Sequence, residues 1–140
     1  MIESNLKSLG LRMADIKILL TTQAHFDHTA DLALIKEKTG ARLYATKADK
    51  SFLEDGGLTD PLIGGIESFR PVMVDGVIAE GDVIELDDIR LRVLELPGHE
   101  GSASYAMTIT ESGHSYDVVV VNMAYICLLY TSDAADEGGS

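Results

Sequence analysis

Four side chains able to bind a metal ion fall within six residues, Gln23-Ala24-His25-Phe26-Asp27-His28. Imidazole and carboxylate groups are good zinc ligands, whereas a neutral amide oxygen is a weaker one. Side chains alternate in direction along an extended segment, so Gln23, His25 and Asp27 are expected on one side and His28 on another. The cluster could therefore serve two adjacent metal positions. The plain alternative is an ordinary polar loop.

The elements around this cluster predict a fold of the α/β class. The apolar run before it predicts a buried strand over residues 16–21. A strand–helix–strand–helix order follows and indicates a parallel α/β layer. Its predicted segments are helices at 3–11, 29–38 and 47–55, a strand at 42–45, and glycine ends at Gly40 and Gly56-Gly57.

The second half of the chain is rich in short β segments. Their apolar and β-branched residues are separated by turn signals at Asp75-Gly76 and Asp87-Asp88. The predicted strands are 72–74, 77–79, 83–86, 89–96, 103–110 and 117–121, and residues 56–71 are predicted as a loop.

A second candidate ligand group, Pro97-Gly98-His99, ends one of these strands. Proline fixes φ and glycine permits an unusual backbone, so His99 is expected to be exposed at the strand end. Ligands of open α/β sheets gather at the carboxyl ends of strands. Because His25, His28 and His99 all follow predicted strands, we expect them to converge, which disfavours the ordinary polar loop.

Composition restricts the class of partner. Eleven basic against 23 acidic residues give a net charge of −12, which disfavours nucleic acid and anionic membranes as partners. The single cysteine, Cys127, excludes an internal disulfide framework and a cysteine-based zinc site. No apolar run approaches the roughly 20 residues of a membrane span, and the residues after Met1 do not resemble a signal peptide.

Other polar residues have simpler interpretations. The pattern predicts solvated carboxylates at turns and helix ends, a solvated histidine at a hairpin tip, flexible glycine loops, and serines without a catalytic base. The carboxylates are Glu54, Asp55, Asp60, Asp87 and Asp88, and the histidine is His114. The glycine loops are Gly56-Gly57 and Gly64-Gly65, and the serines are Ser102 and Ser104.

The His-x-Asp-His motif at residues 25–28, followed some seventy residues later by Pro-Gly-His, resembles the metallo-β-lactamase superfamily. Finer features resemble subclass B3, and within it the GOB-like branch that carries glutamine in place of the first metal-ligand histidine. That glutamine is Gln23 here, and Val121-Asn122-Met123 also matches that branch. The resemblance implies an αββα sandwich with a metal site at one edge.

The resemblance also implies boundaries. Residues 1–126 would be a partial metallo-β-lactamase domain that lacks the N-terminal strands and the C-terminal half. Residues 127–140 are acidic, small and glycine-rich at their end, and we expect a non-native or disordered tail there.

By the same resemblance, Gln23, His25 and His99 would hold one zinc ion. Asp27 and His28 would hold a second, together with a later histidine that this chain lacks, so one or two zinc ions are implied. Asp27 would also orient the nucleophile in catalysis. Asn122 and Met123 would lie near the substrate. Because an amide is a weak ligand, the first site would be weaker than a site with three histidines.

The implied activity is hydrolysis of the β-lactam ring of antibiotics by metal-bound hydroxide, since zinc lowers the pKa of bound water from about 15.7 to about 7. The family further implies antibiotic resistance and a periplasmic or secreted location, and the oligomeric state stays open. One alternative is another hydrolase of this fold, a thioesterase or a lactonase. The other is a non-catalytic chain whose metal site is not assembled.

Overall fold

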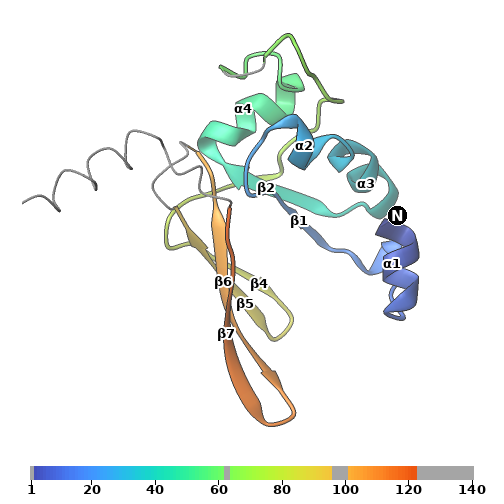
Figure 1. Ribbon diagram of the computed structural model, residues 1–140, viewed down its shortest axis with the longest axis vertical. Coiled ribbons are helices and arrows are strands. Elements are labelled where there is room, and N and C mark those ends of the chain that lie inside the picture. The colour runs from blue at the N-terminus through green and yellow to red at the C-terminus, as the bar shows by residue number, and fades with distance from the viewer. Residues whose placement is uncertain (1, 62–63, 96–100, 123–140) are drawn as a thin grey trace, which may run out of the picture.

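The computed structural model describes residues 2–61, 64–95 and 101–122, so the predictions for His99, Met123 and residues 127–140 lie outside the described residues. The described elements form two β-sheets with helices packed on one of them (Figure 1). The helices are α1 (Ile2–Ser8), η1 (Met13–Asp15), α2 (Phe26–Thr29), α3 (Leu32–Thr39) and α4 (Lys47–Asp55). The strands are β1 (Ile18–Leu20), β2 (Arg42–Thr46), β3 (Gly76–Ile78), β4 (Val83–Leu86), β5 (Ile89–Leu94), β6 (Ser104–Glu111) and β7 (His114–Val120).

The two sheets differ in direction. The first, in the order β1-β2-β3, is wholly parallel, which confirms the predicted parallel α/β layer. The second, in the order β4-β5-β6-β7, is wholly antiparallel. Within the described ranges, the helices and the two sheets form three consecutive layers of the expected αββα sandwich (Figure 1).

Alternation along the first sheet divides the core into two clusters. On β2, Leu43 and Ala45 belong to the cluster under the helices, whereas Tyr44 packs against the cluster between the sheets. On β1, Leu19 packs toward the helices, and Ile18 packs between the sheets. Successive strand side chains point to opposite faces, so one central sheet supports both clusters.

The helix ends follow the predicted glycines. Helix α4 spans the predicted residues 47–55, and α3 ends one residue beyond its prediction. Gly40 and Gly56 cap these two helices with φ of 66° and 77°. This left-handed backbone favours glycine because a side chain would clash with the adjacent carbonyl.

Two predictions in the loop before β3 are wrong. Residues 72–74 are not a strand, because their N–H groups bond to helix α4: Val72 donates to the carbonyl of Leu53, and Val74 to the Glu54 carboxylate. The predicted turn at Asp75-Gly76 leads into a parallel strand instead of a hairpin. There the Asp75 carboxylate accepts the N–H of Leu43 at 2.7 Å.

The N-terminal helix also differs from its prediction. It ends at Ser8 instead of residue 11, and it buries none of its residues. Leu9 and Leu11, which lie within the predicted helix, are 74% and 45% exposed. No helix of the described ranges is long and apolar enough to cross a membrane.

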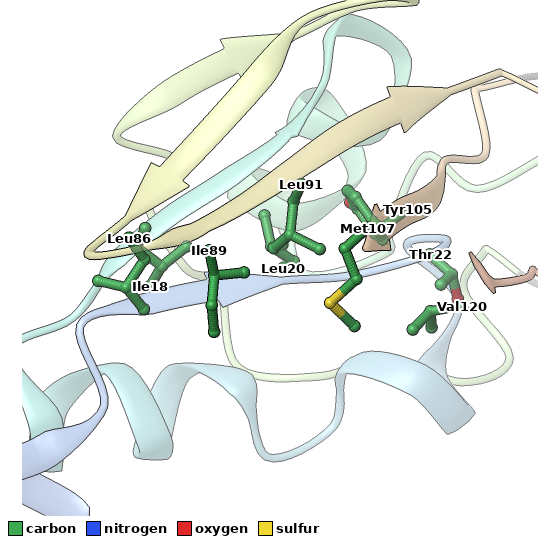
Figure 2. A pocket seen from close by; sticks show the side chains of 9 residues that line it. All are labelled: Ile18, Leu20, Thr22, Leu86, Ile89, Leu91, Tyr105, Met107 and Val120. Carbon is green, nitrogen blue, oxygen red and sulfur yellow. The ribbon is translucent and has the colours of Figure 1, made fainter. Parts of the chain in front are cut away.

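The antiparallel sheet has one apolar face that is only partly covered. Its register places Leu91 beside Met107, and Tyr105 beside Val120. Tyr105 is buried against the first sheet, whereas Tyr116 and Val120 are 50% and 45% exposed. An apolar groove of about 390 Å³ runs between β1 and this face (Figure 2). The parallel sheet therefore covers one part of the antiparallel sheet and leaves another part open.

The two capping glycines provide a matched test of this packing. A Cβ at Gly40 would meet no atom within 4 Å, whereas a Cβ at Gly56 would lie 2.4 Å from the carbonyl oxygen of Phe69. Gly40→Ala should lower the free energy of unfolding by about 1–2 kcal/mol, the cost of a left-handed alanine. Gly56→Ala should cost clearly more, because backbone must also move. Urea unfolding measures both, and equal losses would contradict this packing.

Candidate metal centre

The candidate ligand loop begins where β1 ends, and hydrogen bonds to β6 and its preceding residue fix its start. The hydroxyl of Tyr105 donates to the carbonyl of Thr21 at 2.7 Å, and the N–H of Ala103 donates to the carbonyl of Thr22 at 2.9 Å. Burial, with a smaller contribution from the charge of Asp49, raises the pKa of Tyr105, so its hydroxyl keeps the proton that it donates. The loop is thus held against the second sheet.

A short helical turn brings two candidate ligands together. His25 is the N-cap of α2, and the N–H of His28 donates to the carbonyl of His25 at 3.0 Å. The backbone is therefore helical from Phe26 on, and the prediction that His28 projects away from Gln23 is wrong. The amide nitrogen of Gln23 donates to Nε2 of His28 at 2.5 Å. The Asp27 carboxylate lies 3.4 Å from the same ring nitrogen.

His25 is held by a buried carboxylate. Its Nδ1 lies 2.5 Å from Oδ2 of Asp60, whose side chain is only 2% exposed. An N–H donated from Nδ1 places the ring's lone pair on Nε2, the nitrogen then able to coordinate a metal. Asp60 was predicted to be a solvated turn carboxylate, and that prediction is wrong. No local pattern marks it, because its partner lies 35 residues earlier.

Backbone contacts constrain Gly57 and Gly64, two of the glycines near Asp60 that were predicted to lie in flexible loops. The Asp55 carboxylate accepts the N–H groups of Gly57 and Leu58 at 2.8 and 3.0 Å. The N–H of Gly64 donates to the carbonyl of Asp60 at 2.8 Å, and a Cβ at Gly64 would lie 2.3 Å from that oxygen. Close backbone approach thus requires glycine at residue 64.

Asp49 is a second buried carboxylate near the loop, and the sequence did not single it out. It lies in the first turn of α4, is 3% exposed, and accepts the N–H of Ala24. Burial raises its pKa to about 7, while the bond from Ala24 and the charge of His25 act in the opposite direction. Within the part of the chain that the structure describes, its Oδ2 has no hydrogen-bond partner.

The remaining predicted residues lie at the ends of β6 and β7. Asn122 is buried, and its N–H donates to Oγ of Ser104 at 3.1 Å. Ser104 is itself 1% exposed. His114 is exposed next to the hairpin turn, as predicted, and the carbonyl of Ser112 lies 3.2 Å from its Nδ1.

The chemistry of the gathered donors fits a zinc ion. Gln23 Oε1 is buried without a hydrogen-bond partner among the described residues. The nitrogen of the same amide contacts Nε2 of His28, which also lies 3.4 Å from the Asp27 carboxylate. Rotation of the Gln23 side-chain amide by a half-turn would place Oε1 beside His28, where the amide nitrogen now lies. No three His, Cys, Asp or Glu side chains gather into a metal-binding group within the described ranges. The described residues therefore bring Gln23 next to His28, although the resemblance assigns these two side chains to different zinc positions.

The contact between His25 and Asp60 predicts an effect on metal affinity. Asp60→Asn should weaken zinc binding by about 10- to 100-fold, because the imidazole loses the carboxylate that orients it and raises its basicity. Calorimetric zinc titration measures this. Asp88→Asn removes the same charge from the exposed β4–β5 turn and is the control. Equal affinities in the two variants would contradict a role for Asp60.

The raised pKa of Asp49 predicts a pH-dependent stability. The native state binds this proton up to pH about 7, whereas a carboxyl with the ordinary value of 3.8 releases it earlier. The free energy of unfolding should therefore fall as pH rises from about 4 to about 7. Asp49→Asn should remove a fall of a few kcal/mol, since one pKa unit corresponds to about 1.4 kcal/mol. Urea unfolding at pH 5 and pH 8 tests this. An equal loss of unfolding free energy in the original chain and in Asp49→Asn would refute it.

Comparison with solved structures supports the architecture. The class B3 di-zinc metallo-β-lactamase LRA-12 from an Alaskan soil metagenome is 42% identical, with a TM-score of 0.84 over 88% of this chain and 47% of that one. The metallo-β-lactamase GOB-18 from Elizabethkingia meningoseptica is 39% identical, with a TM-score of 0.85 over 90% of this chain and 47% of that one. These matches confirm the predicted subclass resemblance and the fold.

Curated sequences extend the comparison to another activity. The hydroxyacylglutathione hydrolase of Methylobacterium nodulans is 34% identical over 95 residues, which are 67% of this chain and 29% of that protein. The chain thus spans less than half the length of this relative and of both structures. The family description "Metallo-beta-lactamase superfamily" matches residues 1–121. This chain therefore belongs to the metallo-β-lactamase superfamily, a superfamily of metal-dependent hydrolases.

Proposed function

We propose that the whole protein is a zinc-dependent hydrolase that opens the β-lactam ring of antibiotics. The observation that carries this proposal is Gln23, whose amide lies 2.5 Å from His28 where the subclass more often has a first histidine. The similarity to the metallo-β-lactamases GOB-18 and LRA-12 supports the same choice. Antibiotic resistance and a periplasmic or secreted location belong to this proposal.

In this proposal Gln23, His25 and His99 hold one zinc ion, and Asp27 and His28 contribute to a second position. When bound, zinc lowers the pKa of coordinated water and polarises the substrate carbonyl. Asp60 keeps the proton of His25 on Nδ1, so the imidazole acts as a ligand and not as a general base. Gln23 contributes a neutral donor, which leaves more positive charge at the metal than a charged ligand would.

Asp27 has the role of orienting the nucleophile. The Asp27 side chain is 75% exposed, while its carboxylate stays 3.4 Å from Nε2 of His28. An exposed carboxylate at the edge of a metal site can accept a hydrogen bond from water and fix its direction. Asn122 and Met123 are proposed to border the substrate at the end of β7. Asn122 is buried there, and its Oδ1 has no partner in the described ranges.

A second candidate is a thioesterase on the same fold. The relationship to the hydroxyacylglutathione hydrolase of Methylobacterium nodulans favours it, because that similarity extends over 67% of this chain. A lactonase is a further possibility of the same class. The shared His-x-Asp-His motif does not discriminate among these substrates, since all require attack of water on a carbonyl.

The substrate test uses the whole protein with zinc. We expect it to hydrolyse a cephalosporin and a carbapenem and to leave a hydroxyacylglutathione thioester intact. Removal of zinc with a chelator should abolish this activity, and Asp27→Ala should lower kcat/KM at least about 100-fold. Spectrophotometric rates measure all three effects. Cleavage of the thioester or of a lactone, with both antibiotics left intact, would overturn the β-lactamase proposal and support the alternative.

A further inference from the structure

Strand β7 forms one edge of the antiparallel sheet, and its sequence does nothing to protect that edge. Among the described strands it pairs only with β6, and the hairpin of β6 and β7 extends beyond the parallel sheet (Figure 1). Edge strands are usually kept from pairing with another chain by lysine, proline, a bulge or a short length. β7 has seven residues, no lysine, no proline and an unbroken register with β6, whereas the opposite edge, β4, has only four residues.

The turn before β7 determines which of its backbone groups point outward. Ser112 and Gly113 have φ of 53° and 79°, as in the two-residue turns of hairpins whose flanking residues are hydrogen-bonded to each other. That flanking pair is Glu111 and His114. Hydrogen-bonded and non-hydrogen-bonded pairs alternate along an antiparallel ladder. The residues whose N–H and C=O groups therefore point away from β6 are Ser115, Asp117 and Val119.

Side-chain contacts agree with this alternation. Side chains approach more closely across non-hydrogen-bonded pairs than across hydrogen-bonded ones. Oγ1 of Thr108 donates to the carboxylate of its partner Asp117 at 2.8 Å, and the hydroxyls of Thr110 and Ser115 lie 3.2 Å apart. Asp117 and Ser115 thus belong to non-hydrogen-bonded pairs with β6, and their main-chain groups are available to a strand on the other side.

One face of this hairpin is wholly apolar, and cross-strand partners share a face. Its side chains are Tyr116, Val118 and Val120 on β7 and their partners Ile109, Met107 and Tyr105 on β6. Tyr105 is buried, whereas Tyr116 and Val120 remain about half exposed. None of the six side chains is charged, although the chain has a net charge of −12. A second copy with the same net charge is therefore repelled least along this face.

The charges on β7 also select how two copies of this strand would pair about a two-fold axis. With Asp117 on the axis, two carboxylates would stand directly opposite, which is destabilising. With Tyr116 on the axis, the turn residues of one copy would stand opposite Val119 and Val120 of the other. With Val118 on the axis, Asp117 stands opposite Val119 of the second copy and Tyr116 opposite Val120. This register pairs outward-pointing groups with each other and opposes no like charges.

We propose that the chain forms a closed dimer in which β7 pairs antiparallel with β7 of a second copy, with Val118 on the two-fold axis. Each antiparallel sheet then continues into the other. Val120 lines the apolar groove beside β1 (Figure 2), so Tyr116 of the second copy extends the wall of that groove. The dimer requires neither a bound metal ion nor the proposed substrate, and it can be tested separately from the hydrolase activity.

Sedimentation equilibrium of the 140-residue chain tests the proposal. We expect a reversible equilibrium between the monomer and a species of twice the 15.1 kDa chain mass. Added salt should strengthen the dimer, because it screens the repulsion between two copies of net charge −12. A monomer at all concentrations up to about 1 mM would overturn the proposal. A series of ever larger species would also overturn it, since a two-fold interface closes at the dimer.

Variants of Val119 test the register. Val119→Lys places an ammonium group opposite Asp117 of the second copy, and Val119→Asp places a carboxylate there. Because symmetry repeats the contact twice, the first should tighten the dimer about tenfold and the second should weaken it about tenfold. A dimer that responds to neither variant would show that another surface forms the interface, and would refute the proposal.

Val83 provides the matched control for these charges. It is 44% exposed, against 47% for Val119, and the register places both on the same face at opposite edges of the sheet. Val83→Lys and Val83→Asp change the net charge by the same amounts, and they should shift the dimer constant clearly less. Shifts equal to those of the Val119 variants would mean that net charge alone is responsible, and would contradict the register.

A backbone variant tests the same contact without a charge. Val119→Pro removes an N–H that points away from β6, so the hairpin should persist, since proline is tolerated at the free side of an edge strand. The dimer should be lost. Val119→Ala removes most of the side chain but keeps the N–H, and it should still form the dimer. Circular dichroism of each variant reports the fold, and a folded Val119→Pro that dimerises like the original chain would refute the proposal.

Discussion

The segment from Thr21 to Ala24 is polar and largely buried, and several of its backbone groups depend on distant elements for their hydrogen bonds. Leaving such a group without a partner costs about 1–3 kcal/mol. Tyr105 and Ala103 supply a donor each from the second sheet and the residue before it, and α4 supplies the Asp49 carboxylate as an acceptor. Placing this one loop therefore fixes α4 against the parallel sheet, and fixes that sheet against the antiparallel one.

Local signals in the sequence predicted the bounds of those elements whose capping and turn residues lie next to them in the chain. Helix α4 follows the predicted residues because its cap residues and Gly56 lie next to it, and β4 likewise has its predicted bounds. The four-residue turn of α2 has too few residues to show a helical period. Asp60 and Asp49 could not be identified as supports of the loop, since their partners lie 35 and 25 residues away and charged residues are usually exposed. The motif identified the residue types that could bind a metal, but it did not show which of these side chains contact one another.

The sandwich itself follows from the alternation of apolar residues in the antiparallel sheet. Leu91, Met107 and Tyr105 share one face, while Arg92 and Thr108 belong to the other. A sheet with one apolar face packs that face against another layer. The parallel sheet is narrower than its partner, so the covering stops before Tyr116 and the groove beside β1 remains (Figure 2). Strand β1 therefore lies both at the edge of the parallel sheet and at the edge of the buried core between the sheets.

The separation in sequence between the loop and its supports has a consequence for folding kinetics. The hydroxyl of Tyr105 reaches Thr21 across 84 residues, and Asp60 reaches His25 across 35. Loop closure over such distances is slow and is completed late, so the donors reach their final arrangement only when the chain is almost fully folded. An ion that requires this arrangement would bind after the rate-limiting step. It would then slow unfolding and leave the folding rate unchanged.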